Sequence, residues 1–248
     1  MSGLDGAIQI VVGIAHSCAL LDDGTVWCWG SEVGGAAAGV HALPEKVASL
    51  SEVTQLSAAY DFTCAVLQDL TVKCWGDRFG LGSPTPVTIP GIEDVRQVLV
   101  VSYAGAYVLR FDGGIEYFVG AEALRWDSPI PPAAPEPPVE VVQLAASDTD
   151  DHQSPFLCTL LSDGRVRCSG GNTFGQFGTG DRWGTLPDVL GVHDAVEISA
   201  GYAHVCALLA SGKLRCWGLD DAGQLGIGAI YTNSPYGLAE PADVRGFP

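Results

Sequence analysis

Residues Gly13–Gly30 read GIAHSCALLDDGTVWCWG and decide the fold of this chain. Two short apolar runs, each with one cysteine, flank an Asp-Gly signal for a tight turn. Apolar runs of this length on both sides of such a turn are typical of a β-hairpin. The stretch therefore predicts two antiparallel strands, with one cysteine on each strand.

The same hairpin pattern recurs along the 248 residues of the chain. Its clear copies each hold two cysteines ten residues apart, and these pairs are Cys18 with Cys28, Cys64 with Cys74, Cys158 with Cys168, and Cys206 with Cys216. A divergent copy has Tyr107 and Tyr117 at the cysteine positions. The leading positions 18, 64, 107, 158 and 206 are separated by 46, 43, 51 and 48 residues. This period is typical of propeller blades or solenoid units.

The hairpin turn determines which cysteines face each other. If Gly24 takes the left-handed conformation in the turn, Leu21 faces Thr25 and Cys18 lies opposite Cys28. Opposed Cβ atoms are about 4.5–5.5 Å apart, close to the ~3.5–4.5 Å of a disulfide. We therefore expect one disulfide in each cysteine hairpin and an aromatic pair in the divergent copy. Free buried thiols and zinc sites are the alternatives, but the tight C-x₂-C spacing of zinc ligands is missing.

Each repeat predicts four short strands, and the whole chain predicts an all-β fold. The first strand is apolar, as at 8–12 and 196–200, and the hairpin supplies the second and third. A fourth strand follows a glycine-rich turn, as at 84–89 and 186–190. We expect one domain over residues 1–248, with repeats at approximately 4–50, 51–92, 93–138, 139–192 and 193–248.

The hairpin and the glycine turn after it resemble the RCC1 (regulator of chromosome condensation) repeat. That repeat looks like G-x-x-H-x-x-A-L, D-G-x-V-x-x-W-G and G-Q-L-G-x-G, and the last copy matches it at Gly201, His204, Trp217-Gly218 and 223–228. The resemblance covers nearly the whole chain, and the paired cysteines resemble those of bacterial, secreted members. It implies a β-propeller, usually of seven blades. Five repeats thus predict a five-bladed ring or a segment of a larger propeller.

The chain is strongly acidic, with a net charge of −17 from 12 Lys and Arg against 29 Asp and Glu. Such a balance argues against nucleic-acid binding, which needs a basic face, and against anionic membrane surfaces. No apolar stretch reaches the ~18 residues of a membrane span, and self-repulsion favours a monomer. A disulfide framework predicts an extracellular, periplasmic or cell-surface location, although the first residues show no signal-peptide pattern.

We expect a non-enzymatic scaffold that binds a partner protein through variable loops on one propeller face, the face that precedes the second strand of each repeat. Exposed aromatic side chains there would anchor an interface, because they bury much area at low entropic cost. The candidate partner-binding residues are Tyr60, Asp61, Tyr103, His152, Phe156 and Tyr202. An enzyme-inhibitor role is one form of this hypothesis.

Two other functions stay open. A hydrolase or lyase would use carboxylates in a central funnel, where Asp61 and Asp148 are expected, but nothing fixes a pair at the required separation. The chain could also be a structural surface array of repeats. We assign no catalytic residue, no cofactor and no metal, because the catalytic and nucleotide motifs are missing.

Three further features favour structural roles. The acidic loop 147–154 could bind Ca²⁺ through carboxylates, but it lacks the ligand spacing of a known calcium loop. His16 and His204 occupy equivalent positions and are expected to cap a turn by hydrogen bonding. The proline-rich stretch 128–140 predicts a rigid polyproline connection, with a docking motif as the weaker alternative.

Overall fold

The computed structural model of the chain describes residues 4–31, 40–76, 83–101, 105–118, 139–147, 156–182, 188–228 and 237–246. All regular elements in these ranges are strands, which confirms the all-β prediction. The strands form five antiparallel sheets, of which three have four strands and two have three. No helix in this part of the chain could cross a membrane.

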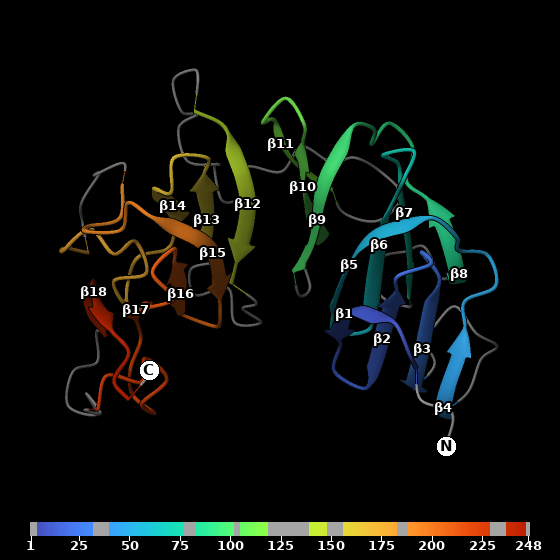
Figure 1. The fold of residues 1–248 in the computed structure, drawn as a ribbon, viewed down its shortest axis with the longest axis horizontal. Coiled ribbons are helices and arrows are strands. Elements are labelled where there is room, and N and C mark those ends of the chain that lie inside the picture. The colour runs from blue at the N-terminus through green and yellow to red at the C-terminus, as the bar shows by residue number, and fades with distance from the viewer. Residues whose placement is uncertain are drawn as a thin grey trace. The chain divides into compact units, whose positions relative to one another are not determined.

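Three of the sheets belong to a first compact unit, Met1–Trp126 (Figure 1). The first sheet has the order β1 (Ala7–Val12), β2 (His16–Leu21), β3 (Val26–Ser31), β4 (Val40–Lys46). The second has the order β5 (Val53–Ala59), β6 (Phe62–Leu67), β7 (Val72–Gly76), β8 (Ser83–Thr88). The third consists of β9 (Val95–Val101), β10 (Gly105–Arg110) and β11 (Ile115–Phe118). Each repeat thus forms its own meander of neighbouring strands.

The other two sheets belong to a second compact unit, Asp127–Pro248. The fourth sheet consists of β12 (Val141–Ala146), β13 (Phe156–Leu161) and β14 (Val166–Gly170). The fifth has the order β15 (Ala195–Ala200), β16 (His204–Leu209), β17 (Leu214–Gly218), β18 (Leu238–Asp243). The prediction of one domain over residues 1–248, with the five repeat ranges given above, stays a prediction.

One predicted strand is not found where it was expected. Residues 188–190 of the stretch 186–190 are not strand, and 186–187 lie outside the described residues. Val189 N donates to Val166 O at 2.8 Å, while Leu190 N donates to Gly178 O at 2.9 Å. Residues 189 and 190 thus bond to two different segments, the strand that begins at Val166 and the turn at Gly178. A continuous ladder to one strand therefore does not form at these two residues.

The cysteine register is confirmed in every hairpin. Cys18, Cys64, Cys158 and Cys206 each lie opposite the cysteine ten residues later. All eight are disulfide-bonded in these pairs. In the third sheet Tyr107 lies opposite Tyr117, with ring centroids 4.8 Å apart. The aromatic pair therefore occupies the place of the disulfide, as predicted.

The hydrophobic core of each unit lies between consecutive sheets. In the first unit, Leu20 and Val26 of the first sheet pack with Leu56 and Trp75 of the second, and a similar cluster joins the second and third sheets. In the second unit, one cluster joins the fourth and fifth sheets. This sheet-on-sheet packing through first strands is the arrangement of propeller blades.

A glutamine on the first strand also joins consecutive sheets. Gln9 accepts from Leu56 N at 2.8 Å and donates to Leu56 O at 2.9 Å. In the second unit, Gln143 makes the same two bonds to Ile198, both at 2.9 Å. Each amide thereby pairs the outward backbone groups of the next first strand, which would otherwise be unpaired.

Candidate partner-binding loops

In the first unit, hydrogen bonds from two other segments fix the loop that precedes β2. Ile14 N donates to Tyr60 O at 2.8 Å, so the loop of the first sheet is tied to the loop of the second. Ser31 N donates to Ala15 O at 2.8 Å. A Cβ on Gly13 would collide with the Tyr60 carbonyl, so the approach of the two loops requires glycine there.

Next to these loops, the side chain of His16 connects the first sheet to the second. The side chain is buried, and its Nε2 shares a hydrogen bond of 2.8 Å with Oγ1 of Thr63 in the next sheet. The ring therefore links two sheets and does not cap its own turn, which corrects the sequence interpretation. Burial lowers the pKa of His16, and the nearby Asp61 carboxylate opposes this shift. Burial therefore favours the neutral form of the imidazole.

Tyr60 has an unusual backbone. Its φ is 51°, in the left-handed region that is costly for a residue with a Cβ. The residue is partly exposed, and its carbonyl is fixed by Ile14. Strained residues persist only where their surroundings hold them, and they concentrate at binding sites. The loop is thus presented to solvent in a fixed conformation.

The second unit has an equivalent loop. Tyr202 is 45% exposed, whereas the next residue, Ala203, is buried. Gly201 N donates to His204 O, and Leu219 N donates to Ala203 O, each at 2.9 Å. Burial lowers the pKa of His204, and Asp220 opposes the shift. This loop repeats the backbone pattern around His16.

The other candidate residues are placed differently. Phe156 is the first residue of β13, is 1% exposed and belongs to the core between the fourth and fifth sheets. It is therefore not an exposed anchor. Tyr103, His152 and Asp148 lie outside the described residues, as does most of the acidic loop 147–154.

Ile14 is a loop residue that the sequence interpretation missed. It is 68% exposed and stands four positions before the first cysteine of its repeat, as Tyr60 and Tyr202 do. Phe156 stands only two positions before its cysteine, where His16 and His204 begin the strand. If the repeats had been aligned on their cysteines, the loop position four residues before the cysteine would have been distinguished from the strand position two residues before it.

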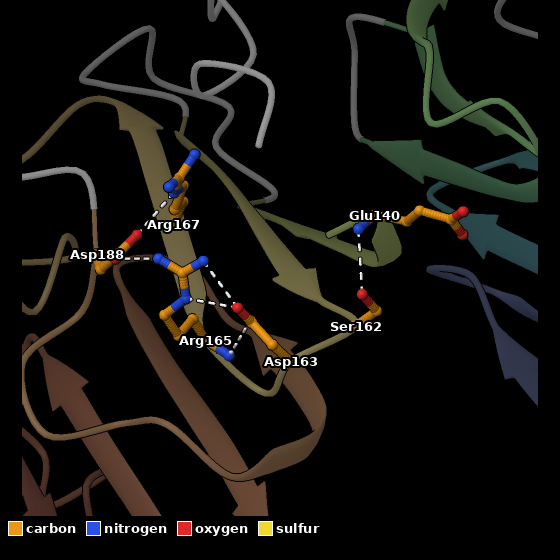
Figure 2. Close-up of polar contacts among 6 residues, drawn as sticks. All are labelled: Glu140, Ser162, Asp163, Arg165, Arg167 and Asp188. Carbon is orange, nitrogen blue, oxygen red and sulfur yellow. Dashed lines mark hydrogen bonds and ion pairs between the residues drawn. The ribbon is translucent and has the colours of Figure 1, made fainter. Parts of the chain in front are cut away.

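A cluster of ion pairs lies at the third strand of the fourth sheet, β14 (Figure 2). Asp188 accepts from Arg165 at 2.8 Å and from Arg167 at 2.6 Å, and Arg165 also pairs with Asp163 (Figure 2). Although partial burial acts against ionisation, these hydrogen bonds lower the pKa of Asp188. The cations are matched by carboxylates, so this cluster is not an anion site.

Within the described residues, no three His, Cys, Asp or Glu side chains gather as a metal site. Asp61 is described but Asp148 is not, so the alternative of a hydrolase or lyase with carboxylates in a central funnel stays a prediction. The loops described above can hold exposed side chains in place for contact with another molecule.

Comparison with protein families identifies the repeat. The family model described as the regulator of chromosome condensation (RCC1) repeat matches residues 7–35 and 195–224. These ranges contain the hairpins with Cys18 and Cys206. No curated protein matches the chain by sequence.

Solved structures share the fold. Prp20p from Saccharomyces cerevisiae, the yeast RCC1, is 17% identical with a TM-score of 0.74, over 96% of this chain and 63% of that one. Human WBSCR16 is 22% identical with a TM-score of 0.67, over 84% and 59% of the two chains. PorZ, a surface component of the type-IX secretion system of Porphyromonas gingivalis, is 15% identical with a TM-score of 0.52, over 96% and 28%. The chain thus spans less than two thirds of each, and its fold is that of RCC1-type β-propellers.

Proposed function

We propose that this chain, which matches the RCC1-repeat model over residues 7–35 and 195–224 and has the fold of RCC1-type propellers, binds a partner protein through the loops preceding the second strands. The observation that carries the proposal is the repeated placement of a loop residue, the exposed Ile14 and Tyr202 and the partly exposed Tyr60, on a backbone fixed by hydrogen bonds. A loop backbone that is already ordered loses little entropy on binding.

Tyrosine suits such a surface. Its ring buries a large apolar area while its hydroxyl still forms hydrogen bonds. Tyrosine is enriched among residues that dominate binding energy. Prp20p, which has the same fold, was described together with its binding to Gsp1p and histones. A likeness of fold supports protein binding as a class and does not name the partner.

We further propose that the protein works outside the reducing cytosol as a non-enzymatic scaffold. The four disulfides support this location, because such bonds persist in oxidising compartments. The net charge of −17 favours a partner with a basic surface, since opposite charge speeds encounter. Inhibition of a partner enzyme is one form that such binding would take.

The test is affinity capture from the secreted and surface fractions of the source cell, using the intact chain. The variants Tyr60→Ser and Tyr202→Ser should each reduce capture of a specific partner about tenfold or more if they are anchors. Phe111→Ser is the matched control, because Phe111 is an aromatic residue that is 55% exposed in a hairpin turn.

Equal capture by all three variants would show that the partner uses another surface. Loss of capture by Phe111→Ser alone would move the site to the hairpin turns. Thermal unfolding of each variant is measured in parallel, so that a misfolded variant is not counted as a binding defect.

A further inference from the structure

The third sheet has the one hairpin without cysteines among the five repeats. In each of the other four hairpins, a disulfide joins two residues that stand ten positions apart on neighbouring strands. Tyr107 and Tyr117 occupy the equivalent register, as direct partners on β10 and β11. Their ring centroids are 4.8 Å apart, near the lower end of the roughly 4.5–7 Å found for paired aromatic rings. The two phenols are thus held in contact where the other repeats have a covalent bond.

Glycine on the second strand makes room for this pair. A Cβ at Gly105 would stand 3.2 Å from Cζ of Tyr117, so the tyrosine ring lies directly against β10 at that glycine. The other four repeats have histidine or phenylalanine at this position, two residues before the cysteine. A side chain of that size would occupy the space of the Tyr117 ring. The glycine and the two tyrosines therefore belong to one local arrangement that differs from the other repeats.

The chain contains little that would compete with these phenols for an oxidant. A free thiol would reduce a tyrosyl radical, but all eight cysteines are held in disulfides. Methionine, which peroxide converts to the sulfoxide, occurs only at Met1. Radicals formed on the tyrosine pair would therefore persist long enough to react with each other.

We propose that Tyr107 and Tyr117 form a site of oxidative cross-linking, at which hydrogen peroxide, used by a haem peroxidase, joins the two rings. Each phenol gives up one electron and one proton and becomes a phenoxyl radical. The two radicals couple through a new bond between ring carbons ortho to the hydroxyls. The hydrogens on the two coupled carbons then move to the oxygens, which restores both phenols. The peroxide takes up the two electrons and two protons and leaves as two molecules of water.

The cross-link would give the third sheet a clamp with different chemistry from the others. Burial raises the pKa of both phenols, so each loses its proton together with the electron and not beforehand. The product is a carbon–carbon bond, which thiols do not cleave, whereas a disulfide is opened by thiol exchange. Like a disulfide, it would restrict the unfolded chain and so stabilise the fold. The third hairpin would therefore stay clamped under reducing conditions that open the other four.

Oxidation of the intact chain by a haem peroxidase with dilute hydrogen peroxide tests the proposal. Trypsin cleaves after Arg96, Arg110 and Arg125, so the cross-link should join the peptides 97–110 and 111–125. The joined peptide should weigh two hydrogen atoms less than the sum of its parts and should show dityrosine fluorescence. A low protein concentration keeps coupling between different molecules rare.

Conservative variants identify the two rings that react. Tyr107→Phe and Tyr117→Phe each keep an aromatic ring but lack the phenol, so each should abolish the joined peptide. Tyr103→Phe, in the same tryptic peptide as Tyr107, is the matched control and should leave the joined peptide unchanged. Circular dichroism checks that each variant is folded. Oxidation should raise the melting temperature of the unaltered chain by roughly 5 °C and should not raise that of Tyr107→Phe.

Three results would count against the proposal. The first is the absence of joined peptides after the treatment has oxidised Tyr202, which is 45% exposed and therefore reports that the oxidant acted. The second is a joined peptide that persists in Tyr107→Phe, which would place the bond at Tyr103. The third is a cross-linked chain with an unchanged melting temperature, which would mean that the bond does not act as a clamp.

Discussion

The side-chain amide of Gln55 binds both backbone groups of Val98 in the next sheet. Its Oε1 accepts from Val98 N at 2.9 Å, and its Nε2 donates to Val98 O at 3.1 Å. The two residues are 43 positions apart, about one repeat. The amide thus ties two first strands together at the edge where neither has another strand beside it.

Replacing this amide by a carboxylate should destabilise the first unit. In Gln55→Glu the donor to Val98 O is lost and an ionised group faces a carbonyl, which should cost about 2 kcal/mol. For a chain of this length, the melting temperature should fall by roughly 4–8 °C. Differential scanning calorimetry at pH 7 measures the change.

The loss in Gln55→Glu should disappear in acid relative to the unaltered chain. Once protonated, the introduced carboxyl group donates and accepts as the amide does, so the fold raises its pKa. The loss of stability is absent below the pKa of the glutamate in the unfolded chain, about 4.3, and complete above its raised pKa in the folded chain. Gln68→Glu, at an exposed residue, is the control and should leave stability unchanged. An equal loss in both variants would show that the link to Val98 is unimportant.

The hairpin turn of the fourth sheet should not tolerate a side chain at Gly164. The residue has a φ of 81°, and a Cβ there would lie 2.6 Å from His193 O. Gly212 has nearly the same φ, 83°, with nothing near its Cβ position. Gly212→Ala should cost about 1 kcal/mol through backbone strain alone, and Gly164→Ala clearly more. Urea unfolding of both variants compares them, and equal losses would contradict the packing at Gly164.

The stability of the fold should decrease as the pH is lowered and His16 is titrated. Because burial lowers its pKa in the folded state, the unfolded chain takes up the proton first, from its ordinary value of 6.5 downward. The free energy of unfolding should therefore decrease between pH 7.5 and 5.5, and part of this decrease should be absent in His16→Gln. An equal pH dependence in the unaltered chain and in His16→Gln would contradict this assignment.

Each disulfide should contribute measurably to stability. Cys64 and Cys74 are fully buried and close a short loop, so the double variant Cys64→Ala/Cys74→Ala should lose about 2–3 kcal/mol. Guanidinium unfolding measures the loss. Peptide mapping without reductant should recover only pairs ten residues apart, and any cross-repeat pair would contradict the hairpin register.

The hairpins could be predicted because their determinants are local. The turn at Gly24 aligns Cys18 with Cys28, and the same register places Tyr107 opposite Tyr117. The stretch 186–190 was less predictable, because a fourth strand depends on the hydrogen bonds that its neighbours offer. Val189 and Leu190 donate to two different segments, and nothing in their own sequence shows this.

The candidate loops were only partly predictable. Tyr60 and Tyr202 were correctly located in loops, but their sequence does not show the φ of Tyr60 or the bond from Ile14 to its carbonyl. Phe156 has the same aromatic character and a neighbouring position, yet it lies in a strand and faces the core. A shift of two positions along the chain separates a solvent-exposed loop residue from a core side chain here.

The sequence by itself determined the hairpin register and the disulfide pairs, because both partners lie within eleven residues and one turn fixes their alignment. Only the tertiary structure decided which equivalent side chains are covered. Ile10 and Leu56 are both aliphatic at the same strand position, but one is 65% and the other 1% exposed. The physical reason is that burial is a property of the neighbouring sheet, which lies a whole repeat away in the sequence.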